Sequence, residues 1–267
     1  ARKGFVVLKY DPIGQGERLQ YYDPDLRTSK VGSTTEEHSH ANGHSVLIGD
    51  NVARYRVWDG MRGIDYLLTR PDVDPKRIGV TGCSGGGTLT TYIAAIDPRV
   101  QAAAPSCYIS SWEDQLKTAG PQDAEQQFPD QLLDGFDHGD LLIAMAPKPY
   151  LICSTTEDFF PLSGAKRTFE EAQRIYNRFG AEDKIAWFTA PGDHGMRADT
   201  RSAVYAWMRK WLQNKPGPAP EPAFTVELEE DLNASKSGQV GGETASTLNI
   251  KRLTAITPVA ADLPSQI

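Results

Sequence analysis

IGVTGCSGGGT, at residues 78–88, is the stretch that decides the fold, because a short apolar run there leads into a glycine-rich corner. Residues 82–86 match the pattern G-x-S-x-G, in which a tight strand-to-helix turn holds a serine, here Ser84, clear of a sheet. The pattern requires a strand before it and a helix after it, and residues 77–82 and 87–96 are compatible with both. We expect small residues on both sides of Ser84, because a β-carbon would clash where strand and helix cross. The alternative is a glycine-rich turn without chemistry.

Length and charge indicate one large domain with an appendage. The chain has 267 residues, which a single hydrophobic core can accommodate. It carries 28 basic and 35 acidic residues, a net charge of −7, without a basic block, so we expect no nucleic-acid partner. No apolar run approaches the roughly 18 residues that cross a bilayer, so we expect no membrane partner.

The first ten residues read as the end of a helix, a glycine stop and a buried strand at residues 5–10. A chain that starts in this way begins within a domain, and we expect it to be a fragment of a longer polypeptide. Any leader would be lost with the upstream part, so a secreted or periplasmic location stays open.

Hydrophobic periodicity predicts alternating strands and helices along the rest of the domain. Further strands are expected at residues 100–104, 150–153 and 185–189, and helices at residues 51–70, 165–179 and around Val204, Met208 and Trp211. Such β-α-β units on both sides of the glycine-rich corner are typical of an α/β fold with a doubly wound, mostly parallel sheet. We assign residues 1–213 to this domain.

Two segments depart from the periodic pattern. Residues 106–147 read as an insertion over the carboxyl ends of the strands, where ligands bind in such sheets. In it, Tyr108 and Trp112 are candidate walls of a substrate pocket, although packing within the insertion explains them equally well. Residues 214–267 read as a proline-rich linker and an extended tail, in which the alternation from Phe224 to Leu228 predicts one strand.

The cysteines do not form a recognisable framework. Cys83, Cys107 and Cys153 are too few and too scattered for a set of disulfides or a zinc knuckle, so we expect small buried residues. A bridge between Cys83 and Cys107 is the alternative if their strands are neighbours.

Three histidines in close succession, His38, His40 and His44, invite a metal interpretation, because three imidazoles can complete a zinc site. No H-E-x-x-H pattern accompanies them, and the surrounding residues 17–50 read as a polar, irregular loop. We therefore expect no metal and no cofactor.

Three side chains follow predicted strands in an order typical of hydrolytic enzymes. Ser84, Asp158 and His194 come in the order nucleophile, acid, base. The ends of parallel strands meet at one rim of the sheet, so these distant residues can come together. The chemistry needs all three, because the imidazole removes the serine proton and the carboxylate fixes the imidazole tautomer.

Each position has competitors. For the base, His138 has no strand before it. For the acid, Glu157 adjoins Asp158 and could replace it, and Asp193 beside His194 is a further carboxylate. Cys83 is not the nucleophile in this register, because the turn requires a small residue two positions earlier and Gly82 serves Ser84.

A tetrahedral intermediate also needs two hydrogen-bond donors, which form the oxyanion hole. The backbone N–H of Gly85, the residue after the nucleophile, is one. The second is expected from a loop upstream of Phe5, so the missing segment, as another chain or within a homo-oligomer, is a possible partner.

With these residues in place, the chain resembles the α/β-hydrolase superfamily. Within it, the chain is most similar to the bacterial acetyl xylan esterase-like hydrolases and to their relatives among the prolyl oligopeptidase-type peptidases. The motifs that carry the resemblance are DPIGQG at 11–16, WDGMR at 58–62, the 78–88 corner, TEDFFP at 156–161 and GDHG at 192–195. The resemblance implies serine ester hydrolysis by Ser84, Asp158 and His194, on a small-molecule or carbohydrate ester. The alternatives are a peptidase with the same three residues and a catalytically silent binding domain.

Overall fold

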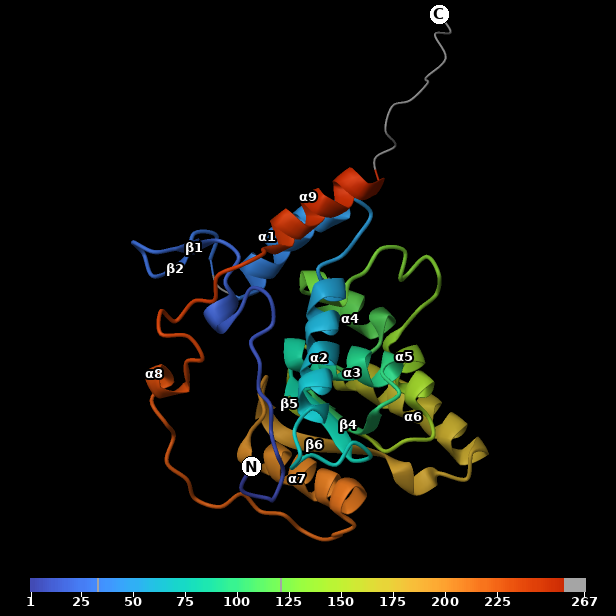
Figure 1. Cartoon of the computed structure of the whole chain (residues 1–267). Coiled ribbons are helices and arrows are strands. Elements are labelled where there is room, and N and C mark those ends of the chain that lie inside the picture. Colours follow the sequence, from blue (N-terminus) through green and yellow to red (C-terminus); the bar gives the residue numbers. More distant parts are fainter. Residues whose placement is uncertain (33, 121, 257–267) are drawn as a thin grey trace, which may run out of the picture.

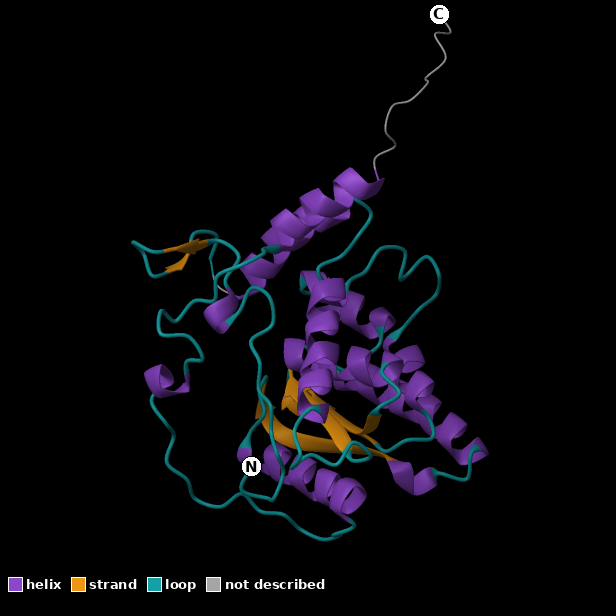
Figure 2. Ribbon diagram, in the orientation of Figure 1, coloured by secondary structure: helices purple, strands orange, loops and turns teal. Residues whose placement is uncertain are grey.

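A four-stranded parallel sheet lies at the centre of the structure, a computed structural model that describes residues 1–32, 34–120 and 122–256 (Figures 1 and 2). Its strands, in their spatial order, are β3 (Ile78–Cys83), β4 (Val100–Ser106), β5 (Tyr150–Glu157) and β6 (Ile185–Asp193). All three strand pairs are parallel, so the four carboxyl ends lie along one rim.

Helices cover both faces of this sheet, which confirms the predicted doubly wound α/β fold (Figure 1). One face is covered by α2 (Ala53–Leu68), α3 (Gly85–Ile96), α5 (His138–Met145) and α6 (Leu162–Arg178). The other is covered by α7 (Ala198–Gln213). Alternate residues of β4 supply the two cores: Ala103 faces the larger helical layer, whereas Ala102 and Ala104 face α7.

Shorter elements complete the chain. They are the two-stranded antiparallel pair β1 (Tyr22–Asp23) and β2 (Thr28–Ser29), the helices α1 (Thr34–Val46), α4 (Trp112–Thr118), α8 (Glu229–Leu232) and α9 (Ala245–Ile256), and the single 3-10 turns η1 (Gly16–Arg18), η2 (Ala124–Gln126) and η3 (Glu182–Lys184). The predicted insertion thus contains α4, η2 and α5.

The strand expected at residues 5–10 is wrong. This segment belongs to neither sheet, and Val7 is 63% exposed. Its larger side chains reach α2 instead, at two glycines: Leu8 lies against Gly63, and the hydroxyl of Tyr10 lies where Gly60 has no side chain. Contacts with a helix surface therefore replace strand pairing.

The irregular loop expected at residues 17–50 is also only partly correct, because α1 forms within it. This helix lies beside α9 from the far end of the chain (Figure 1). Asn249 of α9 is buried between the two, where its amide donates to Ser45 Oγ at 2.9 Å and accepts from Tyr55 OH at 2.8 Å. Tertiary contacts rather than local periodicity stabilise α1.

The tail is less extended than expected. The strand expected between Phe224 and Leu228 does not form, and these two side chains are 50% and 62% exposed. Further along, the Glu17 carboxylate accepts hydrogen bonds from the backbone of Ala234 and Ser235 at 2.6 and 2.8 Å. The tail therefore returns to the first loop of the chain. The last residues of the predicted tail, 257–267, lie outside the described residues.

Candidate active site

Ser84 stands at the corner between β3 and α3 in a backbone conformation that ordinary residues avoid, with φ 59° and ψ −122°. Its N–H donates to Ser106 O at 2.9 Å, which ties the corner to β4. A β-carbon on Gly82 would lie 2.5 Å from Gly86 O, and one on Gly87 would lie 2.5 Å from Ser106 O. A β-carbon on Gly86 would meet no atom within 4 Å. The tightest backbone contacts therefore lie at Gly82 before Ser84 and at Gly87 after it, which agrees with the need for small residues on both sides.

Asp158 and His194 form a hydrogen-bonded pair, with 2.8 Å between Oδ1 and Nδ1. The carboxylate also accepts from the backbone N–H of Phe160 at 3.0 Å and from Thr155 Oγ1 at 3.1 Å. The Asp158 side chain is 1% exposed and that of His194 is 26% exposed. The acid is therefore held rigidly, while the imidazole keeps one edge towards solvent.

The pair shifts the pKa of both members in favour of charge. Burial acts to lower the pKa of His194, but the hydrogen bond and charge of Asp158 outweigh it, so the pKa is raised. Burial acts to raise the pKa of Asp158, but the hydrogen bonds from His194 and Phe160 outweigh it, so the pKa is lowered. The arrangement thus stabilises an imidazolium beside a carboxylate.

Two aromatic rings orient the imidazole. Phe159 stacks on His194 with 4.4 Å between ring centroids, and Phe160 stacks at 5.9 Å. Because both follow Asp158 directly in sequence, one turn supplies the acid and the rings that restrict the base.

The competing acids and bases have other roles. Glu157 is exposed and pairs in the sheet register with Asp193, whose carboxylate bonds to Arg197. His138 is fully buried; its Nδ1 accepts from the N–H of Ser110 at 2.9 Å, and burial lowers its pKa to about 3. The geometry therefore pairs the two residues favoured from the sequence.

Among the hydrogen bonds of the described residues, none joins Ser84 Oγ to His194. Cys107, which follows β4, contacts the loop that carries His194. Its thiol donates to Gly195 O at 3.3 Å and lies within 4.8 Å of the ligand atoms of Asp158 and His194.

All three cysteines are free thiols, so the bridge considered between Cys83 and Cys107 is not formed. The two thiols interact: a hydrogen bond from Cys83 lowers the pKa of Cys107 to about 7 although burial opposes this, and the pKa of Cys83 is raised. Cys83 directly precedes Ser84, so this contact also lies beside the corner.

Gly85 is the first residue of α3, and its N–H therefore belongs to the unpaired amide groups at a helix N-terminus. That is the position required of an oxyanion donor. The second donor, expected upstream of Phe5, stays a prediction.

The aromatic residues proposed as pocket walls lie in the core. Tyr108 is 1% exposed and stacks on His138 at 4.7 Å, and Trp112 is 4% exposed and meets the same ring edge-on at 5.5 Å. Tyr108 belongs to the hydrophobic core of the larger helical layer, whereas Trp112 lines a shallow pocket together with Leu116 and Phe128. That either ring contacts a substrate stays a prediction.

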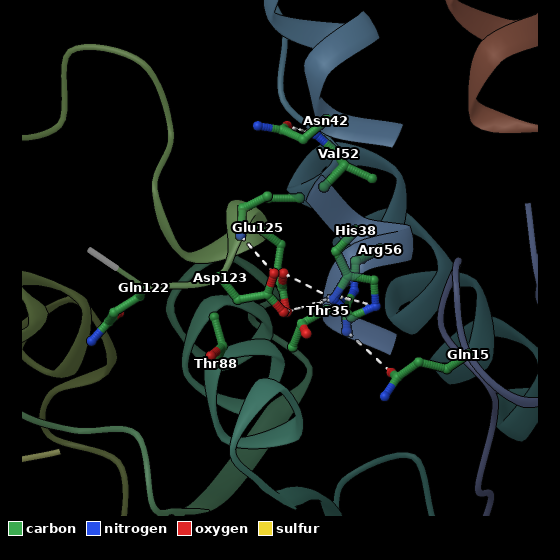
Figure 3. Close-up of polar contacts among 12 residues, drawn as sticks. Gln15, Thr35, His38, Asn42, Val52, Arg56, Thr88, Gln122, Asp123 and Glu125 are labelled. Atoms are coloured by element: carbon green, nitrogen blue, oxygen red, sulfur yellow. Dashed lines mark hydrogen bonds and ion pairs between the residues drawn. The ribbon is translucent and has the colours of Figure 1, made fainter. Parts of the chain in front are cut away.

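A buried charged cluster that the sequence did not reveal lies close to Gly85 at the corner. Figure 3 shows its side chains. Arg56 Nη1 lies 2.7 Å from Glu125 Oε1, and His38 Nδ1 lies 2.7 Å from Asp123 Oδ2 and 3.3 Å from Glu125 Oε2. Arg56 also donates to Gln15 Oε1 at 3.3 Å. Arg56 and Glu125 are completely buried.

One signal could have found this cluster. Arg56 falls on the buried face of α2, in helical register with Ala53, Gly60 and Ile64, and a charge on such a face requires a buried partner. Nothing in the local sequence shows that the partner is Glu125.

The three closely spaced histidines, His38, His40 and His44, do not come together as ligands of one metal ion. His38 faces Asp123 and Glu125, whereas His44 contacts Tyr21 at the surface. The guanidinium of Arg56 lies 2.9 and 3.0 Å from the two ring nitrogens of His38 and adds a permanent positive charge to the cluster. These residues therefore suit a charge-balanced network better than a metal ion.

Comparison with known proteins identifies a family and several relatives of this chain. The sequence profile of the prolyl oligopeptidase family matches residues 44–217. The putative hydrolase YtaP of Bacillus subtilis is 26% identical over 211 residues, covering 78% of this chain and 66% of YtaP. The acetyl esterase Axe7A of Xylanibacter ruminicola is 31% identical over 106 residues, covering 38% of this chain and 23% of Axe7A. The chain thus spans less than two thirds of these curated relatives.

Among solved structures, methylesterase BT1017 superposes with a TM-score of 0.65 at 23% identity, covering 93% of this chain and 51% of that one. The fold defines the class as proteins of the α/β-hydrolase fold. Within that class, the chain belongs to the prolyl oligopeptidase family. None of the helices in the described ranges combines the length and apolarity needed to span a membrane.

Proposed function

We propose that this chain is the catalytic domain of a serine carboxylic ester hydrolase that works through an acyl-enzyme, with Ser84 as nucleophile, His194 as base and Asp158 as acid. The observation that carries the proposal is the 2.8 Å bond between Asp158 and His194 at the same sheet rim as the strained corner of Ser84.

The geometry supports the following chemistry. Because His194 Nδ1 donates to Asp158, Nε2 is the nitrogen left to accept a proton. It takes the proton of Ser84 Oγ as that oxygen attacks the ester carbonyl, and the oxyanion forms at the N–H of Gly85. Nε2–H then protonates the departing alcohol, and a water molecule hydrolyses the acyl-serine by the same steps in reverse.

We propose a small acyl or alkyl ester of a carbohydrate, or another small ester, as the substrate. The relatives support this class, because Axe7A is named an acetyl esterase and BT1017 a methylesterase. The motifs shared with acetyl xylan esterase-like hydrolases point in the same direction.

The test measures hydrolysis of p-nitrophenyl acetate, acetylated xylan and methyl esters by the wild type and by Ser84→Ala. We expect ester turnover to fall on the order of 10⁶-fold in the variant. Ser237→Ala, an exposed serine in the tail, is the matched control. Turnover that survives Ser84→Ala contradicts the proposal.

A serine peptidase is the second candidate function, because the chain belongs to the prolyl oligopeptidase family. It predicts cleavage of aminoacyl-prolyl amides by the same serine. A fluorophosphonate that labels Ser84, combined with hydrolysis of prolyl amides and not of esters, would replace the esterase by the peptidase.

A further inference from the structure

The charged cluster around Arg56 and Glu125 forms from four separate parts of the chain. Gln15 lies in the first loop, His38 in α1, Arg56 in α2, and Glu125 in η2 of the insertion (Figure 3). Complete burial of the Arg56–Glu125 pair is costly unless both charges are compensated. Each has a partner, since Arg56 Nη1 lies 2.7 Å from Glu125 Oε1.

A second ion pair holds Glu125 in place. His38 is 2% exposed, and its Nδ1 lies 2.7 Å from Asp123 and 3.3 Å from Glu125. Burial acts to raise the pKa of Glu125, but His38 and Arg56 lower it to about 2, so the carboxylate is ionised at neutral pH. The cluster therefore keeps a fixed negative charge beside a fixed positive one.

This cluster touches the corner that presents the nucleophile. A β-carbon on Gly85 would lie 3.1 Å from Glu125 Oε1 and 3.5 Å from Arg56 Nη2. The missing side chain at position 85 thus leaves the space into which the ion pair packs. Gly85 does not need glycine for its backbone, because its φ is not positive and it opens α3.

Charge makes both members of the pair necessary. A lone carboxylate close to Gly85 would oppose the negative charge that develops on the oxyanion. Arg56 cancels that charge, and its bond to Gln15 fixes the outer side of the guanidinium. The ion pair can therefore pack against Gly85 without repelling the oxyanion that the N–H of Gly85 binds.

We propose that Arg56 and Glu125 are positioning residues for the oxyanion hole, which hold the N–H of Gly85 and the first turn of α3 in the orientation that the transition state requires. This inference rests on the proposed serine hydrolase function. Neither residue touches the substrate, and the insertion acts on the chemistry through Glu125.

The first experiment uses the space at Gly85. Gly85→Ala, Glu125→Ala and the double variant are compared with the wild type, and Gly43→Ala, a helical glycine whose β-carbon would meet no atom within 4 Å, is the matched control. The readout is the rate of fluorophosphonate labelling at Ser84, with thermal unfolding to show that each variant is folded.

We expect Gly85→Ala to slow labelling about tenfold in the wild type and less than about twofold in the Glu125→Ala background, because the coupling of contacting residues is not additive. Gly43→Ala should change nothing. An equal effect of Gly85→Ala in both backgrounds, or none in the wild type, overturns the proposal.

The second experiment separates positioning from general stability by charge. Arg56→Gln removes the nearer of the two positive partners of Glu125 and leaves it only His38, whereas Arg56→Gln with Glu125→Gln removes both members of the pair. We expect the single variant to label about tenfold more slowly than the double variant, by the electrostatic argument above. Arg54→Gln, at an exposed arginine of the same helix, is the control. A double variant slower than the single one contradicts the inference.

Hydrogen exchange tests the positioning role independently of the proposed hydrolase function. Amide exchange across residues 85–89 reports the order of the first turn of α3 without any turnover. Absence of labelling in the wild type refutes the proposed function, and faster exchange in Glu125→Gln still shows positioning. Unchanged exchange in a folded Glu125→Gln variant refutes the positioning role.

Discussion

Replacing Asp158 by asparagine removes one charge from the acid–base pair while keeping its shape. Oδ1 accepts two hydrogen bonds, from the N–H of Phe160 at 3.0 Å and from His194 Nδ1 at 2.8 Å. Because the backbone N–H can only donate, the asparagine oxygen must take this position. Its amide group then faces the hydroxyl of Thr155, which can accept. His194 therefore keeps its proton on Nδ1, and Nε2 remains the base.

The magnitude follows from the charge alone. Two unit charges 2.8 Å apart attract by about 6 kcal/mol at an effective dielectric constant of about 20. The amide oxygen retains a hydrogen bond to the imidazolium worth roughly 1.5–3 kcal/mol. The net loss is about 3–4 kcal/mol, which lowers kcat on the order of 10²- to 10³-fold. A reversed tautomer would cost on the order of 10⁴-fold instead.

The assay is kcat for p-nitrophenyl acetate in Asp158→Asn, with thermal unfolding as a check on folding and nitrogen NMR of the imidazole to identify the tautomer. A loss of 10⁴-fold or more together with a proton on Nε2 refutes the argument that Phe160 pins the oxygen. A loss below about twofold makes Asp158 dispensable, and Glu157→Gln in the same background then identifies the acid.

Three further predictions concern the corner, the base and metals. Gly87→Ala places a β-carbon 2.5 Å from Ser106 O and should lower the free energy of unfolding, measured by urea titration, by about 1–3 kcal/mol. Gly86→Ala, whose β-carbon would meet no atom within 4 Å, is the control and should not lower it. Equal effects of the two substitutions contradict the packing argument. The raised pKa of His194 means that kcat/KM should rise with pH through a midpoint above 6.5, since the base must be neutral, and a pH–rate profile with a lower midpoint refutes this. Ester turnover should survive dialysis against EDTA, and loss reversed by added Zn²⁺ contradicts the metal-free mechanism.

The sequence was most informative where chemistry coincides with the end of a strand. Ser84, Asp158 and His194 each follow an apolar run closely, and the structure has β3, β5 and β6 there. Strand ends of a parallel sheet share a rim, so short local patterns located two residues that form a 2.8 Å bond across 36 positions. Their catalytic roles remain predictions.

Local patterns failed where distant contacts decide. The apolar residues at 5–10 read as a strand, but glycines of α2 accept Leu8 and Tyr10 instead. The helix α1 has no clear apolar stripe and depends on α9. Glu125 looks like any polar residue of an insertion, and only the fold shows that it meets Arg56. Such pairings follow from topology, which a sequence pattern of a few residues does not contain.

The return of the tail to the first loop determines the order in which the molecule can assemble. The bond from Ala234 to Glu17 spans 217 residues, and that from Asn249 to Ser45 spans 204. Contacts with such separations form only after the intervening sheet has brought the ends of the chain together, because loop closure costs entropy in advance. We therefore expect the tail to dock last during folding and to detach first during unfolding.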